Sequence, residues 1–316
     1  MAKIRVFAGQ AGRSFAAGMC EHLRVPLSPS RLQRFANDCL QVQLLENCRE
    51  RDVFLVQPIV APVQENLMEL LLMIDAARGA SARRITAVMP HFAYARSDKK
   101  DAPRISIGGR LVADLLATAG VDRILTMTLH APQVHAFFRV PTDQLHALHE
   151  LATHFSLQDL AQTTVVSPDL GNAKNATAFA RMLGTPVAAG SKERLDGDAV
   201  TISTVIGDVA GRDVIVLDDE IANGSTIVAI VDLLDRAGAR RIQVACTHGI
   251  FSNGALDRIT ATGRVDTIVC TDTVPHDGLA DDDRVTVLGV APAFAEAVRR
   301  IHSGESVSAL FDHGEV

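Results

Sequence analysis

Short apolar runs typical of β-strands alternate with longer helix-like segments along this chain of 316 residues. Residues 52–56 and 213–217 are two such runs, and each consists of an aspartate followed by four β-forming residues. Continuous apolar runs of this length are typical of strands that are buried on both faces of a parallel sheet. The alternation of strands and helices therefore predicts an α/β fold with parallel sheets covered by helices.

The hydrophobic pattern occurs twice along the chain. The segment Ala-Arg-Arg-Ile at residues 82–85 recurs at residues 239–242, and each copy ends a helix pattern and begins a strand. Flanking strand candidates correspond in the same order: residues 52–56 with 213–217, and residues 121–125 with 265–269. Three ordered matches predict two tandem, similar doubly wound domains, at residues 1–145 and 146–316. The last helix of the chain can pack back on the N-terminal domain.

A strand candidate at residues 214–217 stops at two adjacent aspartates, Asp218 and Asp219. An apolar helix pattern follows as far as residue 238, and small residues precede or open it: Ala222, Asn223, Gly224, Ser225 and Thr226. Backbone N–H groups of such a loop and of a helix N-terminus attract phosphate. Carboxylates at the end of a strand can accept hydrogen bonds from ribose hydroxyls or hold a hard cation. The segment predicts a sugar-phosphate site.

The alternative for this segment is a strand-to-helix turn with an aspartate as helix N-cap. A cap requires one aspartate, whereas Asp218 and Asp219 repel each other unless something pairs with them. The first copy of the repeat has Gln57 and Pro58 at this place, so only the second copy carries the pair. The pattern therefore favours a functional site in the second domain.

A basic segment follows the strand candidate that ends at Met89. Residues 90–110 include a loop with the cations Arg96, Lys99, Lys100 and Arg104. A local excess of cations in an acidic protein suits a polyphosphate. The alternative is a solvated loop whose cations pair with Asp98 and Asp101, and taken alone the segment favours this alternative.

Two further residues follow strand candidates and could bind a metal or a ligand. His130 comes just after the strand candidate that includes residues 121–125, and Asp169 comes just after residues 165–166. A lone histidine at such a place is more often structural than a ligand. Asp169 could equally cap the helix that follows it.

Residues 190–198 lie between strand candidates 186–189 and 199–206 and include the cations Lys192 and Arg194. Glycines and small residues flank these two cations, which suits a mobile loop that closes over an anion. The alternative is a hairpin connection with solvated charges. Neither GxxxxGK[ST] nor GxGxxG is present, so neither common nucleotide fingerprint applies.

Composition excludes several classes of protein. A formal net charge of −6 does not indicate a nucleic-acid partner. The longest apolar runs, such as residues 70–74, are too short to cross a bilayer, and residues 1–7 resemble a strand rather than a signal peptide. Five scattered cysteines without metal-ligand spacing indicate reduced thiols and a cytoplasmic location.

Taken together, these segments resemble ribose-phosphate diphosphokinase, the synthetase of phosphoribosyl pyrophosphate. The resemblance runs nearly end to end and includes Phe-Ala-Gly at 7–9, Glu-Asn-Leu-Met-Glu-Leu at 65–70, Tyr-Ala-Arg at 94–96, Asp-Leu-Leu at 114–116, Leu-His-Ala at 129–131, Ser-Pro-Asp at 167–169, residues 206–212 and residues 305–311. It implies two phosphoribosyltransferase-type domains and a homo-oligomer, commonly dimers assembled into a hexamer.

The resemblance also implies a reaction and the residues that carry it. The family moves the β,γ-diphosphate of ATP to the C1 hydroxyl of ribose 5-phosphate, with Mg²⁺ as cofactor. Lys192 and Arg194 match catalytic cations, and residues 218–226 match the ribose-phosphate loop. His130 and Asp169 match metal-contacting positions. The positions that match the ATP site are Phe35, Asn37, Cys39, Arg96, Ser97 and Lys99.

The chain departs from the family pattern at several of these positions. Ala222 stands where the family usually has an acid, and Glu220 lies two residues earlier. Asn37 and Cys39 replace two acids of the adenine-reading segment, and Thr128 replaces an acid before Leu-His. Ser97 stands in place of a glutamine that usually follows the arginine at 96.

These departures leave alternatives to an ordinary synthetase open. One is a synthetase with an altered nucleotide or sugar preference. Another is a catalytically weak paralogue that assembles with or regulates a true synthetase. A nucleobase phosphoribosyltransferase is disfavoured, because that reaction needs only one such domain.

Overall fold

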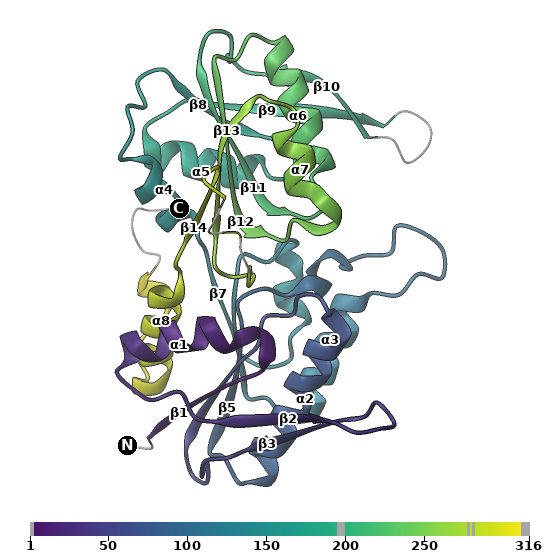
Figure 1. The fold of residues 1–316 in the computed structure, drawn as a ribbon, viewed down its shortest axis with the longest axis vertical. Helices are drawn as coiled ribbons and strands as arrows, with labels where there is room; N and C mark the ends of the chain where they lie inside the picture. Colours follow the sequence, from purple (N-terminus) through teal and green to yellow (C-terminus); the bar gives the residue numbers. More distant parts are fainter. Residues whose placement is uncertain (1–2, 195–199, 277–278, 280–281, 311–316) are drawn as a thin grey trace. The chain divides into compact units, whose positions relative to one another are not determined.

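The computed structural model describes residues 3–194, 200–276, 279 and 282–310. The chain forms two compact units (Figure 1). The first unit contains the chain up to Leu145, Thr273–Pro275 and the segment from Gly289 onward. The second unit contains His146–Asp272 and His276–Leu288.

The first unit is built on a five-stranded parallel sheet in the order β1-β4-β5-β6-β7. Its strands are β1 (Ile4–Ala8), β4 (Asp52–Val56), β5 (Arg84–Met89), β6 (Arg123–Met127) and β7 (Thr142–Leu145), and its helices are α1 (Arg13–Leu23), α2 (Val63–Gly79), α3 (Gly108–Ala119) and α8 (Ala291–Ser303). A separate antiparallel ribbon, β2 (Ser30–Arg34) with β3 (Leu40–Leu44), belongs to the same unit. Figure 1 shows α2 and α3 on one side of this sheet and α1 and α8 on the other.

The second unit is built on a seven-stranded sheet in the order β10-β9-β8-β11-β12-β13-β14, in which only β10 runs antiparallel to its neighbour. The strands are β8 (Thr163–Ser167), β9 (Val187–Arg194), β10 (Val200–Ile206), β11 (Asp213–Ile221), β12 (Arg241–Gly249), β13 (Val265–Thr271) and β14 (Val285–Leu288), and the helices are α4 (Leu148–Phe155), α5 (Ala173–Leu183), α6 (Ser225–Arg236) and α7 (Ala255–Thr260). Short 3₁₀ turns across both units are η1 (Gln10–Gly12), η2 (Ala93–Arg96), η3 (Pro132–Phe137), η4 (Ser252–Gly254) and η6 (Ser308–Leu310).

The apolar pattern explains these elements. β4 and β8 are buried along their whole length, as expected for strands with helices on both faces. α6 buries a stripe of residues spaced by three and four positions, namely Ile227, Ile230, Val231 and Leu234, and this stripe packs on the β11 and β12 core. The prediction of an α/β fold with two similar parallel-sheet domains is confirmed.

The two sheets share one topology. The order β1-β4-β5-β6-β7 corresponds to β8-β11-β12-β13-β14. The repeated Ala-Arg-Arg-Ile segment leads into β5 in one unit and into β12 in the other, and its last two residues are the first two of each strand. The register also agrees, because Asp52 pairs with Arg84 across β4 and β5, and Asp213 pairs with Arg241 across β11 and β12. The second sheet differs by the added β9–β10 hairpin.

The final helix belongs to the first unit. α8 packs against α1 through Phe15 and Phe294, whose ring centroids lie 5.1 Å apart in an edge-to-face arrangement. At the end of α8, Arg84 Nη2 donates to the carbonyl oxygen of Ile301 at 2.9 Å, and Asp52 contacts His302 Nδ1 at 2.8 Å. The first unit is therefore completed by a segment that follows the second unit along the chain.

Several predicted boundaries were wrong by a few residues. β11 continues through the two aspartates to Ile221 instead of stopping at residue 217, and α6 ends at Arg236 instead of 238. The structure extends β9 to Arg194, so the predicted loop at residues 190–198 begins within a strand. Across the described ranges, none of the helices combines the length and the apolar character needed to cross a bilayer.

Candidate sugar-phosphate site

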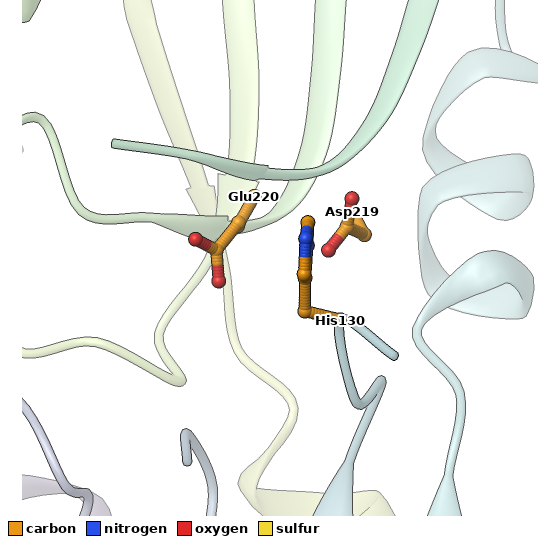
Figure 2. Close-up of side chains that lie close together, drawn as sticks. All are labelled: His130, Asp219 and Glu220. Carbon is orange, nitrogen blue, oxygen red and sulfur yellow. The ribbon is translucent and has the colours of Figure 1, made fainter. Parts of the chain in front are cut away.

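The carboxyl end of β11 carries three consecutive acids, Asp218, Asp219 and Glu220. The ladder to β12 continues past them, since Asp218 pairs with Cys246 and Glu220 pairs with His248. Figure 2 shows the side chains of Asp219 and Glu220 at this end of the strand. The acids are thus fixed by a paired strand within the second unit rather than by a free loop.

The pair Asp218 and Asp219 has perturbed electrostatics. Burial raises the pKa of Asp218 well above its usual value, and the negative charge of Asp219 raises it further. The backbone N–H of Asp219 donates to Asp218 Oδ1 at 2.9 Å. The pair therefore retains a proton more readily than two isolated carboxyls, so one member can donate a hydrogen bond while the other accepts one.

The loop after β11 is shaped by Asn223 and Gly224. Asn223 Oδ1 accepts hydrogen bonds from the backbone N–H of Ser225 at 3.1 Å and from Ser225 Oγ at 2.9 Å. Gly224 is the N-cap of α6 and has a φ of +78°, a conformation that glycine adopts without strain. No side chain caps α6, so the alternative of an aspartate N-cap is wrong for this helix. Thr226 lies in the first turn of the helix.

Asp169 lies on the loop after β8, the strand that pairs with β11 in parallel. Its Oδ1 accepts the backbone N–H of Asn172 at 3.1 Å, just before α5 begins, so it does help to order that turn. Asn172 Nδ2 donates to the carbonyl oxygen of Leu217 at 2.8 Å. This contact joins the Asp169 loop to β11 one residue before Asp218. Sequence reasoning missed the role of Asn172, because a bond to a backbone carbonyl 45 residues away leaves no motif.

The thiols near the acids do not offer a nucleophile. Burial raises the pKa of Cys246 well above its usual value, and it raises the pKa of Cys270 to about 12. Both thiols are therefore neutral at physiological pH and act as small apolar groups in the core of the second unit.

His130 and the basic segment belong to the first unit. His130 is exposed on the segment between β6 and η3, and Figure 2 draws its ring. Arg96 and Lys99 are exposed as well. Ser97 has a structural role, because its Oγ accepts the backbone N–H of Gly108 at 2.8 Å at the start of α3.

The remaining predicted ATP-site residues lie at the tip of the β2–β3 ribbon. The backbone N–H of Phe35 donates to the carbonyl oxygen of Cys39 at 2.9 Å, and Asn37 Oδ1 accepts the N–H of Cys39 at 3.3 Å. Arg34 pairs with both Asp38 and Glu65 at 2.5 Å, which braces the ribbon against α2. The side chains of Phe35, Asn37 and Cys39 are exposed on this chain.

Lys192 and Arg194 occupy the last part of β9 and pair in register with Ile202 and Val200 of β10. β9 and β10 run antiparallel there. The side chains of both cations and the whole of residues 195–199 lie outside the described residues. Their assignment as catalytic cations stays a prediction.

Comparison with known proteins identifies the family. Residues 4–120 match the N-terminal domain of ribose phosphate pyrophosphokinase, and residues 198–312 match the phosphoribosyl synthetase-associated domain. The chain is 66% identical to a Streptomyces coelicolor protein provisionally named a ribose-phosphate pyrophosphokinase, over 99% of this chain and 98% of that protein. It is 49% identical to ribose-phosphate pyrophosphokinase of Deinococcus radiodurans, over 97% of each chain.

A solved structure agrees with these relatives. The phosphoribosylpyrophosphate synthetase of Mycobacterium smegmatis matches with a TM-score of 0.89 and 37% identity, over 96% of this chain and 99% of that chain. The similarity in sequence and in fold extends through both units. The chain therefore belongs to the ribose-phosphate pyrophosphokinase family.

Proposed function

We propose that this protein transfers the β,γ-diphosphate of ATP to the C1 hydroxyl of ribose 5-phosphate and releases AMP. The observation that carries the proposal is the carboxyl end of β11, where Asp218 and Asp219 precede the loop at Asn223 and Gly224 and the first turn of α6. Family membership supports the same reaction.

The sugar phosphate is proposed to bind at this end of the second sheet. Its phosphate would accept hydrogen bonds from backbone N–H groups of the loop and the first turn of α6, whose dipole favours an anion. The hydroxyls of the ribose would meet Asp218 and Asp219. The raised pKa of Asp218 suits this contact, because one carboxyl can then donate and its neighbour can accept.

The donor is proposed to be ATP, held by the first unit. Arg96 and Lys99 are the exposed cations for its phosphates, and the ribbon tip with Asn37 and Cys39 is the proposed reader of the base. Lys192 and Arg194 are proposed to neutralise the charge that develops during transfer. Diphosphoryl transfer depends on positioning and charge neutralisation more than on covalent catalysis.

Mg²⁺ is the proposed cofactor, with Asp169 and His130 as the contacting residues. The carboxylate oxygens of the β8 and β11 ends are the hard donors that Mg²⁺ prefers. When bound, Mg²⁺ would neutralise phosphate charge. Asp169 is positioned for this by its contact with Asn172 N–H, which holds one carboxylate oxygen in place.

Self-association as dimers that build a hexamer is also proposed. Exposed apolar side chains on neighbouring helices of the first unit support it: Met68 of α2, with Leu111 and Leu115 of α3. A cytoplasmic location is supported by the five free thiols, since such thiols persist in reducing compartments. Light scattering of the purified protein measures the oligomer directly.

The decisive experiment measures AMP and phosphoribosyl pyrophosphate formed from ATP and ribose 5-phosphate with Mg²⁺. AMP release that requires ribose 5-phosphate is the expected result. AMP release without the sugar, or no turnover at all, contradicts the proposal. A protein that is inactive alone but changes the rate of an authentic synthetase when mixed with it would instead be a regulatory paralogue.

A further inference from the structure

The back of the loop after β11 is held by one segment, residues 250–258, of the second unit. The backbone N–H groups of Ile250 and Phe251 donate to the carbonyl oxygen of Ile221 at 2.9 and 3.0 Å. The N–H of Ser252 donates to the carbonyl oxygen of Ala222 at 2.9 Å. The carbonyls of the last strand residue and of the first loop residue are therefore both occupied by the same segment.

The next carbonyl is held by an arginine side chain. Arg258 Nη2 donates to the carbonyl oxygen of Asn223 at 2.6 Å, and Arg258 Nη1 donates to that of Asn253 at 2.7 Å. One rigid guanidinium thus joins the loop to the turn that precedes α7. The planar fork of arginine suits two such bonds better than the flexible ammonium of lysine does.

These contacts fix the direction of the N–H groups. The peptide between Asn223 and Gly224 is trans, so the N–H of Gly224 points opposite to the carbonyl that Arg258 holds. In the described part of the chain, no acceptor is found for the N–H groups of Asn223 and Gly224, nor for those of Thr226 and Ile227 in α6. The N–H of Gly224 therefore points away from α7.

Packing closes the side of the loop that faces α7. A Cβ atom at Gly224 would lie 3.2 Å from Ile259 Cδ1 and 3.3 Å from both the Cβ and the carbonyl oxygen of Ala255. The face toward α7 consequently has no room for a ligand. An anion can approach only from the side to which the N–H groups point.

We infer that Arg258 is a positioning residue for the sugar-phosphate loop, which it holds through the Asn223 carbonyl so that the backbone N–H groups face a phosphate monoester. This inference rests on the proposed function. Arg258 itself is placed behind the loop and contacts backbone carbonyls, so it acts through the loop rather than on the substrate. Its loss should weaken the binding of the sugar phosphate and leave the ATP side unchanged.

The test compares Arg258→Ala and Arg258→Lys with the control Arg240→Ala. Arg240 is exposed, and its Nε lies 2.7 Å from Oδ1 of Asp213 at the amino end of β11. Calorimetric titration with ribose 5-phosphate gives Kd, and steady-state kinetics give KM for each substrate. Arg258→Ala should raise Kd and KM for ribose 5-phosphate about tenfold, the effect of one or two hydrogen bonds from a charged donor.

Two results would overturn the inference: unchanged ribose 5-phosphate binding in Arg258→Ala, and an equal rise in its KM for ATP. Arg258→Lys should lie between the wild type and the alanine variant, because an ammonium can donate to the Asn223 carbonyl but lacks the fork that reaches both carbonyls. Thermal denaturation checks that each variant is folded. If Arg258→Ala is unfolded, Arg258→Lys decides, with a rise in KM expected for ribose 5-phosphate alone.

The same titration separates this inference from the proposed function. A wild-type protein that binds ribose 5-phosphate but releases no AMP would contradict the proposed reaction, and the comparison of Kd values would still decide the role of Arg258. A wild-type protein that does not bind ribose 5-phosphate would overturn both.

Discussion

The carboxyl ends of β4 and β11 occupy equivalent places in two sheets of the same topology, yet they carry different polar side chains. In the second unit, β11 leads from Asp218 and Asp219 into a loop whose N–H groups face outward. In the first unit the corresponding position is Gln57, which is completely buried. One strand end carries the acids of the proposed sugar-phosphate site, and the other is closed by side chains of the protein itself.

The closure in the first unit is a hydrogen-bonded network. Gln57 Nε2 donates to Asn66 Oδ1 at 3.1 Å and to Glu69 Oε2 at 2.8 Å. Glu69 Oε2 also accepts the backbone N–H of Gln10 at 3.0 Å. A Cβ at Gly9 would lie 2.5 Å from Gln57 Oε1, so the β1 turn is pressed against the amide.

The comparison shows that two sheets of one topology can end equivalent strands in different polar groups. In the first unit, the carboxyl group of Glu69 accepts the backbone N–H of Gln10 after β1. The Gln57 amide nitrogen is paired within the protein, whereas Gln57 Oε1 is buried without a hydrogen-bond partner. Both strands, β4 and β11, are nevertheless built around buried apolar residues in sheets of the same strand order.

The largest expected effect concerns the hairpin that only the second sheet has. Lys192→Ala and Arg194→Ala should each lower kcat by about 10²–10³, the usual cost of losing a charge that stabilises a transition state. Substrate affinity should change far less. Lys174→Ala on α5 is the matched control. Wild-type turnover in both hairpin variants would show that the hairpin is not catalytic.

A smaller effect is expected at the strand end itself. Asp218→Asn and Asp219→Asn should each weaken ribose 5-phosphate binding about tenfold to a hundredfold, because each replaces a carboxyl of the pair that shares hydrogen bonds with the ribose hydroxyls. Asp213→Asn, at the opposite end of β11, is the control and should bind as wild type does. Calorimetry with ribose 5-phosphate gives the answer, and equal affinities in all three variants would place the sugar elsewhere.

The closed strand end predicts an effect on stability alone. Burial raises the pKa of Glu69, while its bonds from Gln10 and Gln57 oppose that shift. An acid with a raised folded-state pKa binds protons on folding, so it lowers the free energy of unfolding as pH rises from its ordinary range through the raised pKa. Glu69→Gln should remove this dependence without changing KM for ribose 5-phosphate.

Urea denaturation of wild type and Glu69→Gln at a series of pH values measures this pH dependence of the free energy of unfolding. The difference in unfolding free energy between the two proteins should shift in favour of the variant with rising pH and then level off. A difference that is constant over the whole series would mean that Glu69 does not titrate differently in the folded state.

The smallest expected effect lies at the ribbon tip of the first unit. Asn37 and Cys39 offer weaker acceptors to an adenine amino group than carboxylates would. The wild type should therefore discriminate weakly between ATP and GTP. The double variant Asn37→Asp with Cys39→Glu should sharpen the ratio of kcat/KM values about fivefold to tenfold, as expected for exposed hydrogen bonds. Strict ATP selectivity that the double variant leaves unchanged would assign base reading to another segment.

The fold could be predicted from the apolar runs and the internal repeat, because buried parallel strands must be apolar and their order follows from the duplication. Asp218 and Asp219 were placed at the correct strand end for the same reason. The extent of β11 could not be predicted, since only pairing with His248 and Gly249 of β12 keeps the acids in a strand. Asn172 and Arg258 were missed because each bonds a carbonyl 45 or 35 residues away, and backbone acceptors carry no sequence signal.

The path of the chain has a consequence for synthesis on the ribosome. α8 completes the first unit, yet it is made only after all of the second unit. Until it emerges, α1 lacks the partner for Phe15, and Asp52 lacks its contact with His302. The nascent chain must therefore carry an unfinished first domain while the second domain folds, and the segment from Gly289 onward finishes the domain that was begun first.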